Sequence, residues 1–332
     1  MNRKIILHKR PLGTLNPDNF RLLEEPRPDF QSGKLLLKGL FFSVDPYMRN
    51  RMNAFRSYIE PYDIGRPISG DAIAEVIKSD LPEFQTGDLV TGSLPWQEYM
   101  LMDPSRVAKI DNMDISPTAF LSVLGLTGLT AYFGVTDIGR VQSGDQVVIS
   151  AAAGAVGSVA GQIARILGCR VTGITGSEQK VKYIIDDLHF DEAINYKSHP
   201  NIRKALVKSN PKGIDMYFDN VGGDISDSIM YLLNTHARIA LCGQISLYDQ
   251  SRISTGPRLN AQLIVKRARM EGFIVYDYKD RYPEAMEVLK KWIREGELKY
   301  RETIIDGFEN LPSALMGLFK GKNIGKQLVK VN

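Results

Sequence analysis

The sequence is poor in the residues that build metal sites and disulfide frameworks. Its 332 residues include only two cysteines and four histidines. Cys169 and Cys242 are too few for a disulfide framework or for a four-ligand zinc site made of thiolates. The four histidines do not cluster at the spacing of metal ligands; they are His8, His189, His199 and His236. We therefore expect no bound metal and a reducing, cytoplasmic environment.

From the sequence we expect neither an export signal nor a membrane span. Near the start the apolar run is only Ile5–Leu7, which is too short for the core of a signal peptide. Residues 115–136 carry no charge and could cross a bilayer by length alone. They contain Pro117, Gly125 and Gly128, however, and no basic cluster flanks them. We expect a buried helix at a domain junction, in a soluble protein.

Neither sign of charge is in large excess. The 42 Lys and Arg against 38 Asp and Glu give a formal net charge of +4, and the basic residues are scattered. This distribution argues against a nucleic-acid partner and fits a small anionic ligand better. The 43% of hydrophobic residues is typical of a soluble globular protein, and the length favours two domains.

The pattern of apolar residues changes along the chain. The first part predicts short strands separated by turns, whereas the part after residue 145 alternates strands with helices, which is typical of βαβ units and a parallel sheet. The strands expected first are 34–42, 72–78 and 88–91. The strands expected later are 146–150, 170–174, 192–195, 214–218, 238–242 and 326–331, with helices at 157–167, 178–188, 225–233 and 283–294.

A turn rich in small residues follows the first strand of the alternating part. The run from Ala151 to Gly157 leads from a strand into a helix, where backbone amides and the helix N-terminus could approach a pyrophosphate. Ala152 occupies the first glycine position of the pattern G-x-G-x-x-G. A chance Ala/Gly-rich helix start is the alternative, but the position of the turn favours a dinucleotide. The candidate cofactor-binding residues are Gly154, Ala155, Val156 and Gly157.

The end of the second strand distinguishes NADPH from NADH. An NAD enzyme would carry a carboxylate at the strand tip to hold the adenosine ribose. Here Gly176 and Ser177 lead to Lys180, whose ammonium could pair with a 2′-phosphate. Alternatively, Ser177 is only an N-cap and Lys180 a solvated lysine, and the nearby Glu178 weakens the case for an anion site. We favour NADPH.

Six motifs together resemble the medium-chain dehydrogenase/reductase superfamily, and within it the zinc-free branch of leukotriene dehydrogenase/prostaglandin reductase and alkenal double-bond reductases. The resemblance covers nearly the whole chain. The motifs are 44–49 (VDPYMR), 125–134 (GLTGLTAYFG), 151–161, 219–223 (DNVGG), 270–275 (MEGFIV) and 321–326 (GKNIGK).

The resemblance implies a fold, a domain division and a reaction. The fold is a Rossmann doubly wound parallel sheet plus a GroES-like, mainly β domain. Residues 1–120, completed by 300–332, would form the GroES-like substrate domain, and 121–299 the NADPH-binding domain. The reaction is NADPH-dependent reduction of the carbon–carbon double bond of enals and enones, without zinc and in a homodimer, as is common in the family.

The resemblance also assigns roles to single residues. Lys180 and Tyr196 match residues at the 2′-phosphate, and Tyr248 matches the tyrosine proposed to hydrogen-bond the substrate carbonyl; the alternative for Tyr248 is a loop tyrosine that packs over the cleft. Tyr47 lies on the substrate side or is simply buried in the β domain. The remaining cofactor-binding candidates are Asn220, Cys242, Gly243, Phe273, Ile274, Val275 and Asn323.

Two other functions remain open at this point. One is an NADPH:quinone oxidoreductase of the same superfamily, with the same fold and cofactor. The other is a catalytically silent NADPH-binding protein that regulates a partner. No Ser-His-Asp set or carboxylate pair has a local context that favours hydrolysis.

Overall fold

The computed structural model describes residues 1–111, 114–249 and 254–331. The chain divides into two compact units. The first unit combines Met1–Leu121 with Glu302–Asn323 and Gln327–Asn332, and the second combines Ser122–Arg301 with Ile324–Lys326.

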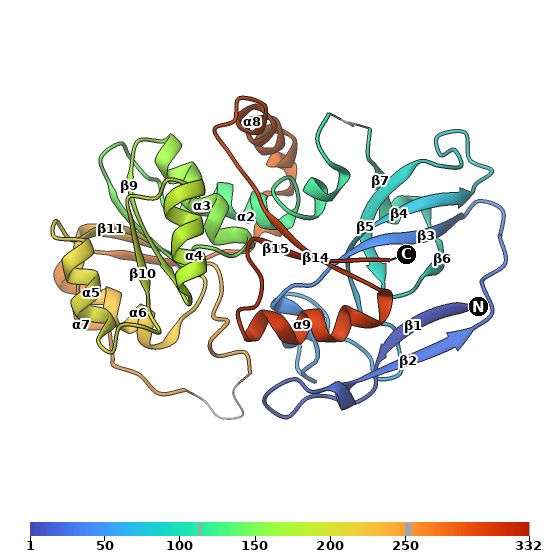
Figure 1. Ribbon diagram of the computed structural model, residues 1–332, viewed down its shortest axis with the longest axis horizontal. Helices are drawn as coiled ribbons and strands as arrows, with labels where there is room; N and C mark the ends of the chain where they lie inside the picture. Colours follow the sequence, from blue (N-terminus) through green and yellow to red (C-terminus); the bar gives the residue numbers. More distant parts are fainter. Residues whose placement is uncertain (112–113, 250–253, 332) are drawn as a thin grey trace. The chain divides into compact units, whose positions relative to one another are not determined.

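The second unit is built on a six-stranded sheet with the order β10-β9-β8-β11-β12-β13, in which all neighbouring strands are parallel. Figure 1 labels its strands β9, β10 and β11. The strand of this sheet that comes first in the sequence, β8, therefore lies in the middle beside β11, and the strand order reverses between them. In open α/β sheets ligands bind beyond the carboxyl ends of the strands at this switch point. The strands are β8 Gln146–Ser150, β9 Arg170–Thr175, β10 Glu192–Asn195, β11 Ile214–Asp219, β12 Leu233–Leu241 and β13 Arg269–Gly272.

The helices of this unit alternate with its strands. On α3, Ala155–Ile166, Val159 and Ile163 are buried because they recur every four residues on one face, whereas Leu167 at the helix end is 36% exposed. Ala285 and Leu289 on α8 are buried for the same reason. The helices are α2 Leu126–Phe133, α3 Ala155–Ile166, α4 Glu178–Lys182, α5 Ile202–Ser209, α6 Gly223–Met230, α7 Asn260–Lys266 and α8 Tyr282–Arg294.

Two helices expected from the sequence are divided. The uncharged stretch 115–136 forms a 3-10 helix at Pro117–Leu121 and then α2, with Gly125 in an extended conformation between them. The stretch 178–188 begins as α4 and continues as a π-helical turn over Tyr183–Asp187. In the part of the chain that the structure describes, no helix is long and apolar enough to cross a membrane.

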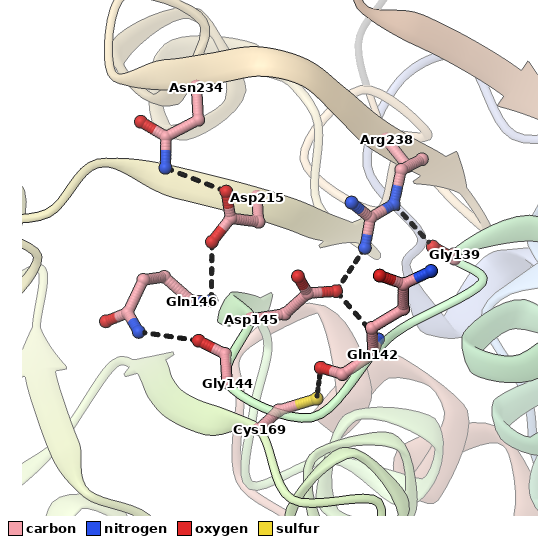
Figure 2. Close-up of polar contacts among 9 residues, drawn as sticks. All are labelled: Gly139, Gln142, Gly144, Asp145, Gln146, Cys169, Asp215, Asn234 and Arg238. Carbon is pink, nitrogen blue, oxygen red and sulfur yellow. Dashed lines mark hydrogen bonds and ion pairs between the residues drawn. The ribbon is translucent and has the colours of Figure 1, made fainter.

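A polar cluster ties the amino ends of the strands together (Figure 2). Arg238 on β12 forms an ion pair with Asp145, and its Nε donates to the carbonyl of Gly139 at 2.8 Å. The thiol of Cys169 donates to the carbonyl of Gln142 at 3.3 Å. Since this edge of the sheet is opposite the carboxyl ends, we expect the cluster to stabilise the fold rather than to bind a ligand.

The first unit is mainly β. Its larger sheet has the order β14-β15-β3-β4-β5-β7, with β6 also paired to β3, while β1 and β2 form a separate pair. The tail strand β15 pairs with β3 in antiparallel fashion, with Val329 opposite Phe42. The elements are β1 Asn2–Leu7, β2 Phe20–Glu25, β3 Leu35–Ser43, α1 Tyr47–Arg51, β4 Ser69–Lys78, β5 Leu89–Pro95, β6 Tyr99–Met102, β7 Val107–Lys109, β14 Glu302–Asp306, α9 Leu311–Phe319 and β15 Lys326–Lys330.

The core of the first unit is formed by apolar residues from both ends of the chain. Phe42 from β3 packs edge-on against Phe308 from the tail, with the ring centroids 6.1 Å apart. The predicted fold class, a Rossmann sheet plus a mainly β unit, is confirmed.

Candidate functional site

The turn after β8 has the geometry of an anion-binding site. Gly154 caps α3 in an extended conformation, and the helix begins at Ala155. The first N–H groups of a helix have no partner within it, so those of Ala155 and Val156 are directed out of the helix end, where an anion is favoured. At Gly157 a Cβ would be 2.4 Å from the carbonyl oxygen of Ala151, and only glycine allows this close packing. The residues present therefore fit a pyrophosphate.

The structure explains the missing first glycine of this turn. Ala152 is fully buried, and its N–H donates to the carbonyl of Ile174 at 3.0 Å. The residue that its methyl group faces on β9 is Gly173, where a Cβ would be 2.9 Å from the Cβ of Ala152. Because Gly173 has no side chain, the neighbouring strand leaves room for the methyl group of Ala152. The residue before it, Ala151, adopts a left-handed backbone conformation with φ of 49°.

Ser177, Lys180, Tyr196 and Lys197 lie just after the carboxyl ends of β9 and β10. Ser177 caps α4 by accepting the N–H of Lys180 at 3.3 Å, so the N-cap role is present. The ring of Tyr196 packs beside Gly176. The ammonium of Lys197 lies 6.0 Å from the centroid of that ring.

The electrostatics of this corner favour an anion. Burial, followed by the nearby charge of Lys197, lowers the pKa of Lys180. The carboxylate of Glu178, a concern from the sequence, accepts from Asn195 at 2.6 Å and Ser198 at 3.4 Å. A doubly charged phosphate beside Lys180 and Lys197 would stabilise the protonated form of Lys180. Lys197 was not among the site residues expected from the sequence.

The loops after β11 and β12 are joined by backbone hydrogen bonds. The N–H groups of Cys242 and Gly243 both donate to the carbonyl of Asp219, at 2.9 and 3.0 Å. Asn220 donates from Nδ2 to the carbonyl of Ser150 at 2.8 Å. Burial, and then Asp219, raises the pKa of the Cys242 thiol to about 12, so this residue is a neutral thiol rather than a nucleophile. Asn220, Cys242 and Gly243 thus lie together at the switch point.

The Phe273–Val275 segment follows the edge strand β13. The Phe273 ring packs edge-on against Phe218, with centroids 6.3 Å apart. The carbonyl of Val275 accepts from the Tyr282 hydroxyl at 3.0 Å. Ile274, between Phe273 and Val275, has an extended conformation. These contacts hold the segment beside the end of the sheet.

Tyr248 turns back toward the end of β12. Its hydroxyl oxygen accepts the N–H of Gln244 at 3.1 Å, which leaves its own proton for another acceptor. Its hydroxyl also lies next to Gly243. Burial is the main cause that raises the pKa of Tyr248 above its usual value of 10. Tyr248 is therefore a hydrogen-bond donor throughout the neutral range.

Two of the expected site residues belong to the first unit. Tyr47 lies at the start of α1 and packs against the apolar core of that unit, in keeping with the packing alternative. Asn323 directly precedes Ile324–Lys326, the tail segment that belongs to the second unit. In that segment the N–H of Gly325 donates to the carbonyl of Ala153 at 2.8 Å, so the chain next to Asn323 is bonded to the glycine turn.

The two cysteines lie at opposite ends of the parallel sheet. Cys169 directly precedes β9 in the polar cluster of Figure 2, and burial is the main cause that raises its pKa to about 12. Cys242 directly follows β12. Across residues 1–111, 114–249 and 254–331, no three His, Cys, Asp or Glu side chains group in a way that could hold a metal ion.

Two family models match the chain. Residues 3–110 match the N-terminal domain of oxidoreductase, and residues 155–291 match the model described as zinc-binding dehydrogenase.

Relatives and solved structures match over almost the full length. The chain is 50% identical to the putative NADP-dependent oxidoreductase YfmJ of Bacillus subtilis, over 99% of this chain and 98% of that protein. It is 42% identical to the NADP-dependent 2-alkenal reductase of Nicotiana tabacum, over 91% of this chain and 88% of that protein. The crystal structure of CurA from Vibrio vulnificus in complex with NADPH matches with a TM-score of 0.95 and 41% identity, covering 99% of each chain.

Proposed function

Because the chain belongs to the medium-chain dehydrogenase/reductase superfamily, in the branch of alkenal and prostaglandin reductases, we propose that it is an NADPH-dependent oxidoreductase. Its substrates would be α,β-unsaturated aldehydes and ketones, whose carbon–carbon double bond it reduces. The observation that carries this proposal is the Tyr248 hydroxyl, which keeps its proton and lies beside Gly243 at the end of β12.

The cofactor would extend along the carboxyl edge of the second unit. The amides at the start of α3 would hold the pyrophosphate, and Lys180 with Tyr196 the 2′-phosphate. The nicotinamide would lie against the two segments at the ends of β12 and β13, namely Cys242–Gly243 and Phe273–Val275. Asn220 and Asn323 complete the proposed cofactor site.

The chain's own residues support the reduction by binding and by hydrogen bonding. Bound NADPH supplies the hydride that reaches the β-carbon of the substrate. Negative charge then develops on the carbonyl oxygen, and Tyr248 stabilises it by donating its hydroxyl proton in a hydrogen bond. Water would then supply the proton that the α-carbon takes up. Since the pKa of Tyr248 is raised, the hydroxyl stays a donor and does not add a competing negative charge.

We also propose how the units and copies of the chain divide the work. The unit with Ser122–Arg301 would bind NADPH, and the unit that contains Tyr47 would supply the substrate side. A homodimer in the cytoplasm fits the family resemblance. In the second unit β13 is an edge strand, and Ile264 and Val265 on the preceding α7 are 74% and 65% exposed, which offers an apolar surface to a second copy.

Steady-state kinetics with two substrate panels test the proposed reaction. With NADPH, we expect catalytic turnover of enals and enones, and the same rate after treatment with a zinc chelator. Turnover of quinones without turnover of any enone would instead identify a quinone oxidoreductase. Tight NADPH binding without oxidation by any conjugated carbonyl would identify a silent regulatory protein.

A further inference from the structure

A buried carboxylate lies at the switch point of the sheet, and the reaction described above gives it no role. Asp219 is the last residue of β11, between β8 and β12, and is only 2% exposed. Burying a charge is costly unless hydrogen bonds compensate for the lost water. A buried aspartate at this position therefore requires hydrogen-bond donors, and these donors identify the part of the structure that the carboxylate holds in place.

Both oxygens of the Asp219 carboxylate accept hydrogen bonds. Oδ1 accepts from the Tyr217 hydroxyl at 2.8 Å and from the successive N–H groups of Val221 and Gly222, each at 2.9 Å. Oδ2 accepts from the Ser226 hydroxyl at 2.6 Å. Burial, and then Asp219 itself, raises the pKa of Tyr217 well above its usual value, so its hydroxyl is a neutral donor. The loop after β11 is thus folded around the carboxylate.

This loop is bonded on one side to the start of the glycine turn. The N–H of Asn220 donates to the Ser150 hydroxyl at 2.9 Å, while its side chain donates to the Ser150 carbonyl. The Ser150 hydroxyl in turn lies 3.3 Å from Oδ1 of Asp219. Ser150 ends β8, so these bonds anchor the loop after β11 to the neighbouring strand.

On its other side the loop is bonded to the segment that leads to Tyr248. The carbonyl of Asn220 accepts the N–H of Ile245 at 3.3 Å, and the carbonyl of Val221 accepts the N–H of Ser246 at 3.1 Å and its hydroxyl at 2.6 Å. Tyr248 follows two residues later. The orientation of these two carbonyls depends on the conformation of the loop after β11. The Asp219 carboxylate fixes that conformation by accepting the N–H groups of Val221 and Gly222.

We propose that Asp219 is a positioning residue for the reaction: its carboxylate fixes the 220–223 loop and, through it, places the nicotinamide-facing segment from Cys242 to Tyr248. This inference rests on the proposed function. It assigns to Asp219 an effect on the nicotinamide end and on turnover, but not on the adenosine end of the cofactor.

A comparison of two aspartates on the same strand tests the proposal. Asp219→Asn keeps the size of the side chain and removes its charge. The matched control is Asp215→Asn at the other end of β11, where Asp215 accepts the N–H of Gln146 and Nδ2 of Asn234, each at 2.8 Å (Figure 2). For each variant we would measure kcat with an enone, the fluorescence of bound NADPH, the Kd of 2′,5′-ADP, and Tm.

The two variants are expected to differ in kcat and in the fluorescence of bound NADPH. Asp219→Asn should lower kcat by about ten-fold or more, the size of a lost charge-assisted hydrogen bond, and should change the NADPH fluorescence. Its Kd for 2′,5′-ADP should stay within about two-fold, because that ligand lacks the nicotinamide end. Asp215→Asn should lower Tm but leave kcat within about two-fold.

Equal kcat losses in the two variants, or a normal kcat and fluorescence in Asp219→Asn, would overturn the proposal. If Asp219→Asn does not fold, Ser226→Ala removes one donor and keeps the carboxylate; it should lower kcat by about three-fold or more with 2′,5′-ADP binding retained, and an unchanged kcat would refute the idea. Absence of enone turnover in the unsubstituted protein would instead count against the proposed function.

Discussion

Replacing Lys180 by methionine tests whether the Lys180 ammonium binds the 2′-phosphate of NADPH. Methionine keeps most of the aliphatic stem and its packing while removing the ammonium. In the unliganded protein, burial and the charge of Lys197 both disfavour the protonated form of Lys180, as its lowered pKa shows. A bound 2′-phosphate would reverse the second effect, because it places negative charge beside both ammonium groups.

The expected loss of NADPH affinity follows from one charge-assisted hydrogen bond. Such a bond contributes roughly 1.5–3 kcal/mol, so the Kd for NADPH should rise about 10- to 150-fold, while the Kd for NADH should barely change. Isothermal titration calorimetry measures both. Lys182→Met is the matched control, because Lys182 is an exposed residue on the same helix and the net charge changes equally.

The same substitution should stabilise the unliganded protein. A lysine whose folded pKa lies below its unfolded value binds more protons when unfolded, so its presence lowers the free energy of unfolding at neutral pH, and this deficit disappears as the pH rises toward 10.5. Lys180→Met should therefore raise Tm at pH 7 and have little effect on Tm above pH 10.5.

Equal losses of NADPH and NADH affinity in Lys180→Met would refute the assignment of Lys180 to the 2′-phosphate.

Three further substitutions test other parts of the site and fold. Tyr248→Phe should lower kcat more than it weakens NADPH binding, and in the unsubstituted enzyme kcat should fall only above pH 10, where the raised pKa of Tyr248 lies; an unchanged kcat would exclude this hydroxyl as the donor. Ala151→Gly should maintain the free energy of unfolding or raise it by up to about 1 kcal/mol, because a left-handed alanine is strained, and chemical denaturation measures the difference. Arg238→Met should lower the free energy of unfolding by about 1.5–3 kcal/mol, since it removes the partly buried, charge-assisted pair with Asp145, with NADPH affinity retained.

The parallel sheet could be predicted because its strands are short apolar runs between clear breaks. The expected strands 146–150 and 192–195 coincide with β8 and β10. The helix expected over 115–136 was wrong as a single element, because Pro117 starts a 3-10 helix and Gly125 interrupts the chain before α2. Periodicity does not show such interruptions.

Short polar helices were harder to predict. The helix α5, Ile202–Ser209, is short and fully buries only Leu206, with Ile202 and Ala205 partly buried beside it. It was not expected, and neither was α7, none of whose side chains is fully buried. Each connects two strands of the parallel sheet, since α5 follows β10 and α7 follows β12.

The candidate site was predictable in its motifs but not in its cross-strand contacts. The turn at Gly154–Gly157 and the position of Lys180 follow from local sequence. The proximity of Lys197 to Lys180 depends on the pairing of β9 with β10, and the role of Asp219 depends on how the loop after β11 folds. Likewise, Ala152 could be understood only once Gly173 was seen opposite it on the adjacent strand.

Tracing the hydride tests the central claim most directly. The enzyme would be incubated with an enone and NADPH deuterated at the transferable C4 position, and the product analysed by NMR. The proposed function predicts a saturated ketone with deuterium on the former β-carbon. Deuterium on the carbonyl carbon of an allylic alcohol, or no transfer to any enone, would contradict it.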